Sequence, residues 1–419
     1  MGVGGTRTGP AVGAEAATPD WVLVFFCFLA LAVSFSARST LGLVMPFWEA
    51  DLSVSREFGS AVGASMLIVM AFLAPAAGHL ADRFGAVTLL AAGLVVVGAG
   101  LLLASVSSAP LLVAASWVGV SAIGFGVVAM HVAATAVAPG AGTRRGLATG
   151  IATSGASAGQ LLVIPFLGLV LQAAGWRFSL ASVGVAAMVL GLLLATMRNG
   201  RTRAAGASAP RVSDAVGVGT QLRALARSPV FHALFWSFTL CGFTTAGVIE
   251  VHFLPYASFC GFAPVTGATA FGVLSAVNLC GMILAGWLAD RMDRPLLLGA
   301  IYLLRAASFV LLMNIGSDVS LLYLFAVVFG LFDYATVPVT ASLVATHLGT
   351  RAMGLAMGLI SAGHAVGAAA AAYGAGVLFQ MTDGYAWVWI SSTALAAVAG
   401  VLVLPLGDRR GAGNGRVPA

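Results

Sequence analysis

The sequence predicts an all-α polytopic membrane protein with twelve transmembrane helices in two six-helix bundles. Three observations lead to this fold class. Of the 419 residues, 60% are hydrophobic and 8% are charged, whereas an ordinary soluble protein has about 25% charged residues. Apolar runs long enough to cross a hydrocarbon core of about 30 Å recur along the whole length. Two motifs from the first half also return in the second half.

The apolar runs are each expected to be a helix, because the backbone in lipid must satisfy its own hydrogen bonds. Six runs precede a polar stretch and six follow it. The expected spans are 21–46, 59–79, 86–106, 110–138, 146–172 and 177–197, then 229–256, 264–287, 294–313, 317–345, 352–379 and 385–405. The function must therefore reside within the membrane.

The basic residues predict the orientation. All 20 are arginine, and an N-terminus inside places sixteen on the cytoplasmic side, leaving only Arg56 and Arg177 outside. Both termini are therefore expected to be cytoplasmic, and the net charge of +6 reflects this topology and not a nucleic-acid partner. The absence of lysine favours a GC-rich bacterial genome, and hence the bacterial cytoplasmic (inner) membrane.

The same pattern gives the domain limits. We expect a disordered cytoplasmic tail at 1–20, a first bundle at 21–197, a cytoplasmic linker at 198–228, a second bundle at 229–406 and a tail at 407–419. The linker is rich in Gly, Ala, Ser and Arg, with a surface helix expected after Ser213.

An internal repeat relates the two bundles. "GHLADR" at 78–83 returns as "GWLADR" at 286–291, an offset of 286 − 78 = 208. At the same offset, "GLATGIATSGASAG" at 146–159 returns as "GLAMGLISAGHAVG" at 354–367. Because an even number of helices separates the copies, the two bundles have the same orientation, which is a parallel repeat.

These motifs resemble the major facilitator superfamily over residues 21–405. The two "ADR" segments look like that family's signature loop between helices 2 and 3 and its weaker copy between helices 8 and 9. The resemblance implies gating residues at the cytoplasmic ends of these helices, where charges hold the halves together when the cavity opens outward: Asp82, Arg83, Asp290 and Arg291. A simple topology anchor remains the alternative for Asp82 and Arg83. Gly78 and Gly286 permit close helix approach.

Within the superfamily the chain is most similar to the monocarboxylate transporters and the related oxalate and formate exchangers. "SFSARSTLGLVMPFWEADLSVSREF" resembles their first helix, with a substrate-related basic residue at Arg38. "VIEVHFLPYASFCGF" resembles the outer end of helix 7 in bacterial members. One departure is that Asn278 and Met282 stand where the monocarboxylate transporters have an Asp and an Arg. A lysine of the exchangers would fall near Ile360, one turn from His364.

Ionisable residues at membrane depth each need a partner, a watery cavity or a function. There are seven: Arg38, His131, Glu250, His252, Arg305, Asp333 and His364. Small or polar residues at helical spacing flank Arg38, Asn278, Asp333 and His364, which indicates a cavity or a tight helix contact.

Two arginines have alternative roles. The planar guanidinium of Arg38 suits a substrate carboxylate, and the alternatives are an ion pair with Glu250 or contact with the outer surface. Arg305 and Asp333 lie on consecutive antiparallel helices, so we expect a structural ion pair, with a direct substrate role for Arg305 as the alternative.

The sequence thus predicts a secondary transporter for a small organic anion, a carboxylate, operating by alternating access. The predicted substrate-binding residues are Arg38, Asn278, Arg305 and His364, and Glu250 and Asp333 are hypothesised to couple transport to protons. The alternatives are an efflux carrier for hydrophobic or cationic compounds, and a membrane enzyme or sensor. We expect a monomer in the lipid bilayer, without enzyme activity, cofactor or metal ion.

Overall fold

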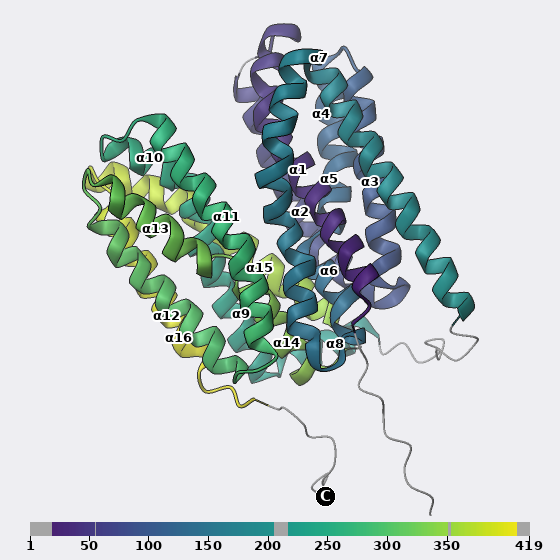
Figure 1. Ribbon diagram of the computed structural model, residues 1–419, viewed down its shortest axis with the longest axis vertical. Helices are drawn as coiled ribbons and strands as arrows, with labels where there is room; N and C mark the ends of the chain where they lie inside the picture. The colour runs from purple at the N-terminus through teal and green to yellow at the C-terminus, as the bar shows by residue number, and fades with distance from the viewer. Residues whose placement is uncertain (1–18, 55, 205–216, 351–352, 409–419) are drawn as a thin grey trace, which may run out of the picture.

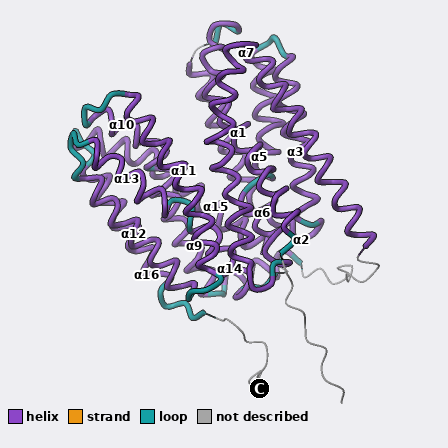
Figure 2. The backbone as a smooth tube through the Cα atoms, viewed as in Figure 1, coloured by secondary structure: helices purple, strands orange, loops and turns teal. Residues whose placement is uncertain are grey.

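The computed structural model describes residues 19–54, 56–204, 217–350 and 353–408. Every regular element in these ranges is helical (Figure 2). Most of the predicted tails lies outside the described residues, which include only 19–20 of the first tail and 407–408 of the second, and residues 205–216 of the predicted linker also lie outside them. Within the described part of the linker, the helix α7 (Arg145–Ala204) ends and a separate helix, α8 (Val218–Ala226), follows.

The N-terminal half comprises the helices before the linker. Its fourth span is irregular and is divided into four elements, one of them a π-helix. The elements are α1 (Trp21–Asp51), α2 (Arg56–Phe84), α3 (Ala86–Val106), α4 (Pro110–Ala114), η1 (Ala115–Ser121), α5 (Ala122–Val127), α6 (Met130–Val137), two short 3₁₀ turns, η2 (Ala138–Gly140) and η3 (Gly142–Arg144), and α7 (Arg145–Ala204).

The C-terminal half has two irregular spans. Its first span contains a π-helical segment, and its fourth span is interrupted. The elements are α9 (Pro229–Gly242), η4 (Phe243–Gly247), α10 (Ile249–Phe259), α11 (Pro264–Ala289), α12 (Arg294–Met313), α13 (Val319–Phe332), α14 (Thr336–His347), α15 (Met353–Thr382) and α16 (Ala386–Val403).

Ten of the described helices are long and apolar enough to cross a membrane, and an eleventh is added if α9–η4 and α10, which are bent by 41°, form one span. The predicted span 146–172 is the first part of α7. A straight helix of 60 residues would be about 90 Å long, but Gly175 (φ 78°, ψ 171°) interrupts α7. The count of twelve and the location of the termini stay predictions.

The two halves meet at one end of the molecule and diverge toward the other (Figure 1). We call the end with α8 and α14 the closed end, and the end with α4 and α10 the open end. Two helix pairs make the most extensive contacts between the halves, α2 with α15 and α7 with α11, and α14 also contacts α6 and α7. These pairs contain the repeated sequence motifs.

The predicted span 317–345 corresponds to Val319–His347, which is long and apolar enough to cross a membrane but is not one continuous helix. It is interrupted at residues 333–335, between α13 and α14. Pro338 explains the interruption, because its missing N–H leaves the Tyr334 carbonyl without a partner in a regular helix. The span 110–138 is interrupted in a similar place, at residues 128–129.

An ion pair at the closed end connects α12 to the residues after α16. The Arg294 guanidinium donates to the Asp408 carboxylate, with an Nε–Oδ1 distance of 2.9 Å. Its Nη1 also donates to Thr346 Oγ1 at 2.7 Å and to the Ser342 carbonyl at 3.3 Å. Because Arg294 is only 4% exposed, this charge depends on protein partners.

Candidate functional site

A polar network links the two halves through the Asn278 amide on α11. Its Nδ2 donates to Ser157 Oγ on α7 and to Asp333 Oδ2, both at 3.3 Å. Its Oδ1 accepts from the Tyr334 backbone N–H at 3.1 Å. Asn278 therefore connects the N-terminal half with the interruption between α13 and α14.

The Tyr334 hydroxyl extends this network to α10, where it donates to the Glu250 carboxylate. Tyr334 is half-buried and Glu250 is exposed. Tyr334 and Ser157 were not predicted as site residues, because neither is charged at neutral pH and neither stands at a position that the family resemblance singled out. Pro338, four residues after Tyr334, was the available signal that the backbone is irregular here.

Arg38 lies in the middle of α1 and is half-buried. Its Cζ lies 4.4 Å from the centroid of the Phe35 ring. This contact lies within the N-terminal half, and the Glu250 carboxylate takes its hydrogen bond from Tyr334. The alternative ion pair between Arg38 and Glu250 stays a prediction.

His364 on α15 contacts the first span of the C-terminal half instead of the Asn278 network. Its Nε2 lies 3.4 Å from Thr245 Oγ1 in η4, and its ring lies 5.1 Å from the Phe238 ring. Gly242 allows this approach, because a Cβ there would overlap the His364 backbone.

Arg305 contacts Asp333 in a different way from the predicted ion pair. Its guanidinium donates to the backbone carbonyls of Phe332 and Asp333, while the Asp333 carboxylate accepts from Asn278. Its Nη1 lies 2.9 Å from Cys241 Sγ. Arg305 is fully buried. Its guanidinium therefore packs against the interrupted backbone and is not on an accessible surface.

The Asp82 and Asp290 carboxylates connect the halves at the closed end. Asp82 accepts from the N–H groups of Gly354 and Leu355, at 2.7 and 2.8 Å. Asp290 accepts from Gly146 and Leu147 at the same distances. Each carboxylate therefore satisfies backbone donors at the start of a helix in the other half, where the helix dipole favours negative charge.

The neighbouring arginines, Arg83 and Arg291, contact residues of their own half. The Arg83 Cζ lies 5.2 Å from the Phe84 ring centroid. The Arg291 Cζ lies 3.9 Å from the Trp287 ring centroid, and the guanidinium donates to the Trp287 carbonyl. Of the four predicted gating side chains, the two aspartates therefore make the contacts between halves.

Glycines make these closed-end contacts possible. A Cβ on Gly78 would overlap the Gly354 carbonyl, and a Cβ on Gly286 would overlap the Gly146 carbonyl. Gly150 and Gly358 also lie against backbone of the facing helix. These four glycines, which repeat at the offset of 208, thus lie where backbones of the two halves approach closely.

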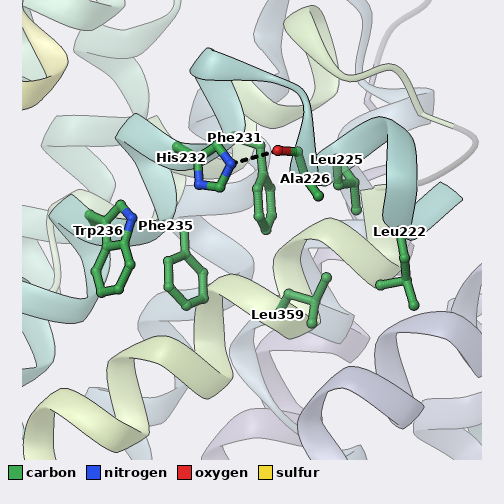
Figure 3. A pocket seen from close by; sticks show the side chains of 8 residues that line it. All are labelled: Leu222, Leu225, Ala226, Phe231, His232, Phe235, Trp236 and Leu359. Atoms are coloured by element: carbon green, nitrogen blue, oxygen red, sulfur yellow. Dashed lines mark hydrogen bonds between the residues drawn. The ribbon is translucent and has the colours of Figure 1, made fainter.

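An apolar cavity of about 320 Å³ lies at a separate place, between α8, α9 and α15 (Figure 3). Leucine and aromatic side chains form most of its wall, and His232 Nε2 lies 2.8 Å from the Ala226 carbonyl. None of the predicted site residues lines it. Among the described residues, no group of three or more His, Cys, Asp or Glu side chains is placed to hold a metal ion.

The fold, the internal repeat and the closed-end contacts define the class of protein. The profile of the Major Facilitator Superfamily matches residues 27–315 and 281–418. The chain belongs to this superfamily of transporters, and it is not an enzyme.

Proteins with similar sequences include members of the monocarboxylate transporter branch. It is 27% identical to the MFS-type transporter YcxA of Bacillus subtilis over 374 residues, which cover 87% of this chain and 90% of YcxA. It is 23% identical to monocarboxylate transporter 13 of Bos taurus over 388 residues, covering 91% of this chain and 88% of that protein. The resemblance to the monocarboxylate transporters is therefore confirmed.

Solved structures share the fold. The fucose–proton symporter FucP of Escherichia coli has a TM-score of 0.72 at 17% identity, covering 91% of this chain and 97% of FucP. The human organic anion transporter MFSD10 has a TM-score of 0.71 at 17% identity, covering 92% of this chain and 99% of that chain.

Proposed function

We propose that this transporter moves a small organic anion, a carboxylate, and that Arg38 binds its carboxylate group. The observation that carries the proposal is a permanent charge at the middle of α1 whose contact within its own half is an aromatic ring. A buried or half-buried arginine in a membrane protein needs an anionic partner or water. A carboxylate matches the guanidinium fork with two parallel hydrogen bonds.

Two polar side chains of the C-terminal half are included in the proposed substrate site. Asn278 on α11 and His364 on α15 both carry groups that can form hydrogen bonds to a polar substrate. The monocarboxylate transporter relatives favour the same substrate class. Arg305 is fully buried, so we assign it a different role below.

We further propose which end of the molecule faces the cytoplasm. The closed end contains Asp82, Asp290 and the linker helix α8, and the arginine bias assigns it to the cytoplasm of a bacterial inner membrane. The open end then faces outward. In this arrangement the closed-end contacts prevent access from the cytoplasm while substrate reaches Arg38 from outside.

The experiment measures counterflow of labelled lactate, pyruvate, oxalate, succinate and benzoate into proteoliposomes. We expect Arg38→Gln to reduce uptake of the transported member by about tenfold or more, because an amide provides neither the charge nor the bidentate geometry. Arg177→Gln is the matched control, since Arg177 is an exposed arginine paired with Asp51 at the open end, and it should retain wild-type uptake. Uptake that survives in folded Arg38→Gln contradicts the proposal.

Proton coupling is proposed to involve the hydrogen-bonded carboxylates Glu250 and Asp333. We expect Glu250→Gln or Asp333→Asn to abolish accumulation driven by a pH gradient while exchange of labelled for unlabelled substrate continues, since only net transport requires a proton to move. The two assays are compared on the same vesicles. If both variants still accumulate substrate in response to the gradient, neither carboxylate couples transport.

The second candidate is an efflux carrier for hydrophobic or cationic compounds. Glu250 favours it, because this exposed carboxylate could meet a cation entering from the open end. Drug-resistance profiles of a deletion strain distinguish the two functions. Hypersensitivity to cationic compounds, combined with no uptake of any carboxylate in the panel, would support efflux.

A further inference from the structure

The interruption between α13 and α14 leaves backbone carbonyl groups without hydrogen-bond donors from their own helix. The carbonyls at the end of a helix have no partners within it, and backbone in the hydrocarbon region cannot rely on water. Phe332 is the last residue of α13 and Asp333 follows it. Their two carbonyls therefore need donors from another element.

Arg305 on α12 supplies those donors. Its guanidinium donates to both carbonyls, and its positive charge lies at the end of a helix, where the dipole favours a cation. On the other side of the interruption, Asn278 accepts from the Tyr334 N–H, and the Val337 N–H donates to the Tyr334 carbonyl at 3.0 Å. Side chains of two neighbouring helices thus complete the irregular backbone.

The same guanidinium contacts the other irregular segment of this half. Cys241, which lies 2.9 Å from Nη1, comes two residues before the π-helical segment η4 that leads into α10. The interruption carries Tyr334, and α10 carries its partner Glu250. Arg305 therefore lies between the two segments whose shapes bring Tyr334 and Glu250 together.

We infer that Arg305 is a positioning residue, which stabilises the interrupted form of this span and thereby directs Tyr334 toward Glu250 and Asn278. It acts through the backbone and does not contact substrate. The inference rests on the proposed function only in taking the Asn278–Tyr334–Glu250 network as part of the transport site.

Without Arg305, we expect the backbone around residues 333–335 to favour a continuous helix over the interrupted form. In a continuous helix the Phe332 and Asp333 carbonyls would accept from the N–H groups of Thr336 and Val337, four residues on. That change satisfies both carbonyls without Arg305, and Pro338 leaves only the Tyr334 carbonyl unpaired. The Tyr334 N–H would then donate to the Gly330 carbonyl, four residues earlier, and no longer to Asn278, so the orientation of Tyr334 changes. Arg305 and the continuous helix are therefore competing ways to satisfy the same two carbonyls.

The test follows the accessibility of position 334 without using any substrate. Tyr334→Cys is introduced with Cys260→Ser and Cys280→Ser, because the other cysteines, Cys27 and Cys241, are buried. A water-soluble maleimide then labels the cysteine in proteoliposomes. We expect Arg305→Met to slow labelling by about tenfold, the scale set by leaving a buried carbonyl unpaired, whereas Arg305→Lys keeps a cationic donor and stays within about threefold.

Arg294→Met is the matched control, because Arg294 is the other buried arginine of α12 and lies at the closed end. It should destabilise the protein and leave labelling of Tyr334→Cys unchanged. If Arg305→Met does not fold, Arg305→Gln replaces it in the same comparison. Unchanged labelling in a folded Arg305→Met or Arg305→Gln protein overturns the inference.

Transport kinetics separate positioning from direct binding. Arg305→Lys is expected to retain the KM of the wild type, whereas a direct substrate contact predicts a KM raised about tenfold by loss of the bidentate fork. A tenfold rise in KM with unchanged labelling would overturn the inference in favour of direct binding. If the wild type transports no carboxylate, the proposed function fails, and the labelling comparison still decides the role of Arg305.

Discussion

Valine at Gly286 is expected to reduce transport by about a hundredfold or more, because the conformation with a closed end can no longer form. A Cβ at this position would overlap the Gly146 carbonyl, and the further methyl groups of valine enlarge the clash. The obstructing atom belongs to a helix backbone, so it cannot move aside as a flexible side chain can. A cost of about 3 kcal/mol, at the upper end of overpacking, changes the balance between conformations by about two orders of magnitude.

Gly272→Val is the matched control, since Gly272 lies on the same helix and a Cβ there would meet no atom within 4 Å. Spin labels at Leu111→Cys and Phe259→Cys, both exposed at the open end, report the conformation. Gly286→Val should shorten the distance between the labels, because losing the closed end brings the open ends together. Equal distances and equal transport in the two variants would show that close backbone contact at Gly286 is not required.

Removing the Asp408 carboxylate is expected to lower the free energy of unfolding by about 3 kcal/mol or more. Asp408→Ala leaves the buried Arg294 guanidinium without its anionic partner, and an uncompensated buried charge is strongly destabilising. The unfolding midpoint in detergent, measured by thermal or denaturant titration, provides the comparison with the wild type.

A double variant separates the value of the ion pair from the penalty of breaking it. Arg294→Met with Asp408→Leu should recover most of the lost stability, because no charge remains buried. Asp318→Ala is the control: this exposed aspartate caps α13, so its loss should lower the free energy of unfolding by about 1 kcal/mol. The expectation fails if the double variant is as unstable as Asp408→Ala.

The sequence predicted the fold well where its signals are periodic or repeated. Long apolar runs gave most of the helices, because lipid permits few other structures. The shared offset of 208 identified the two "ADR" motifs and the glycine-rich segments, and the structure pairs each motif with the opposite glycine-rich segment. What the repeat could not reveal was that Asp82 and Asp290 accept hydrogen bonds from backbone N–H groups at the start of the facing helix.

The candidate site was harder to predict, because partners far apart in sequence depend on how helices rotate about their axes. Glu250, Asp333 and Asn278 were all predicted as site residues, but their hydrogen-bond pairings were not. The pairs Tyr334–Glu250 and Asn278–Asp333 depend on the interruption before α14. Pro338 marked that interruption, but prolines also occur within continuous helices, such as Pro75 in α2. The carbonyls that bind Arg305 have no sequence signature, since every residue carries one.

The two carboxylates at the closed end bind backbone N–H groups where a helix begins. Apart from Gly146 and Gly354, at which a Cβ would overlap the carboxylate, the side chains of those helix starts matter little to this contact. Substituting Leu355 or Leu147 leaves the donor N–H groups in place. Inserting one residue just before Gly354 or Gly146 would instead turn the donors about 100° around the helix axis. Away from these glycines, closure of this transporter is therefore expected to tolerate substitutions and to be sensitive to changes in length, so insertions and deletions limit how these helix starts can evolve.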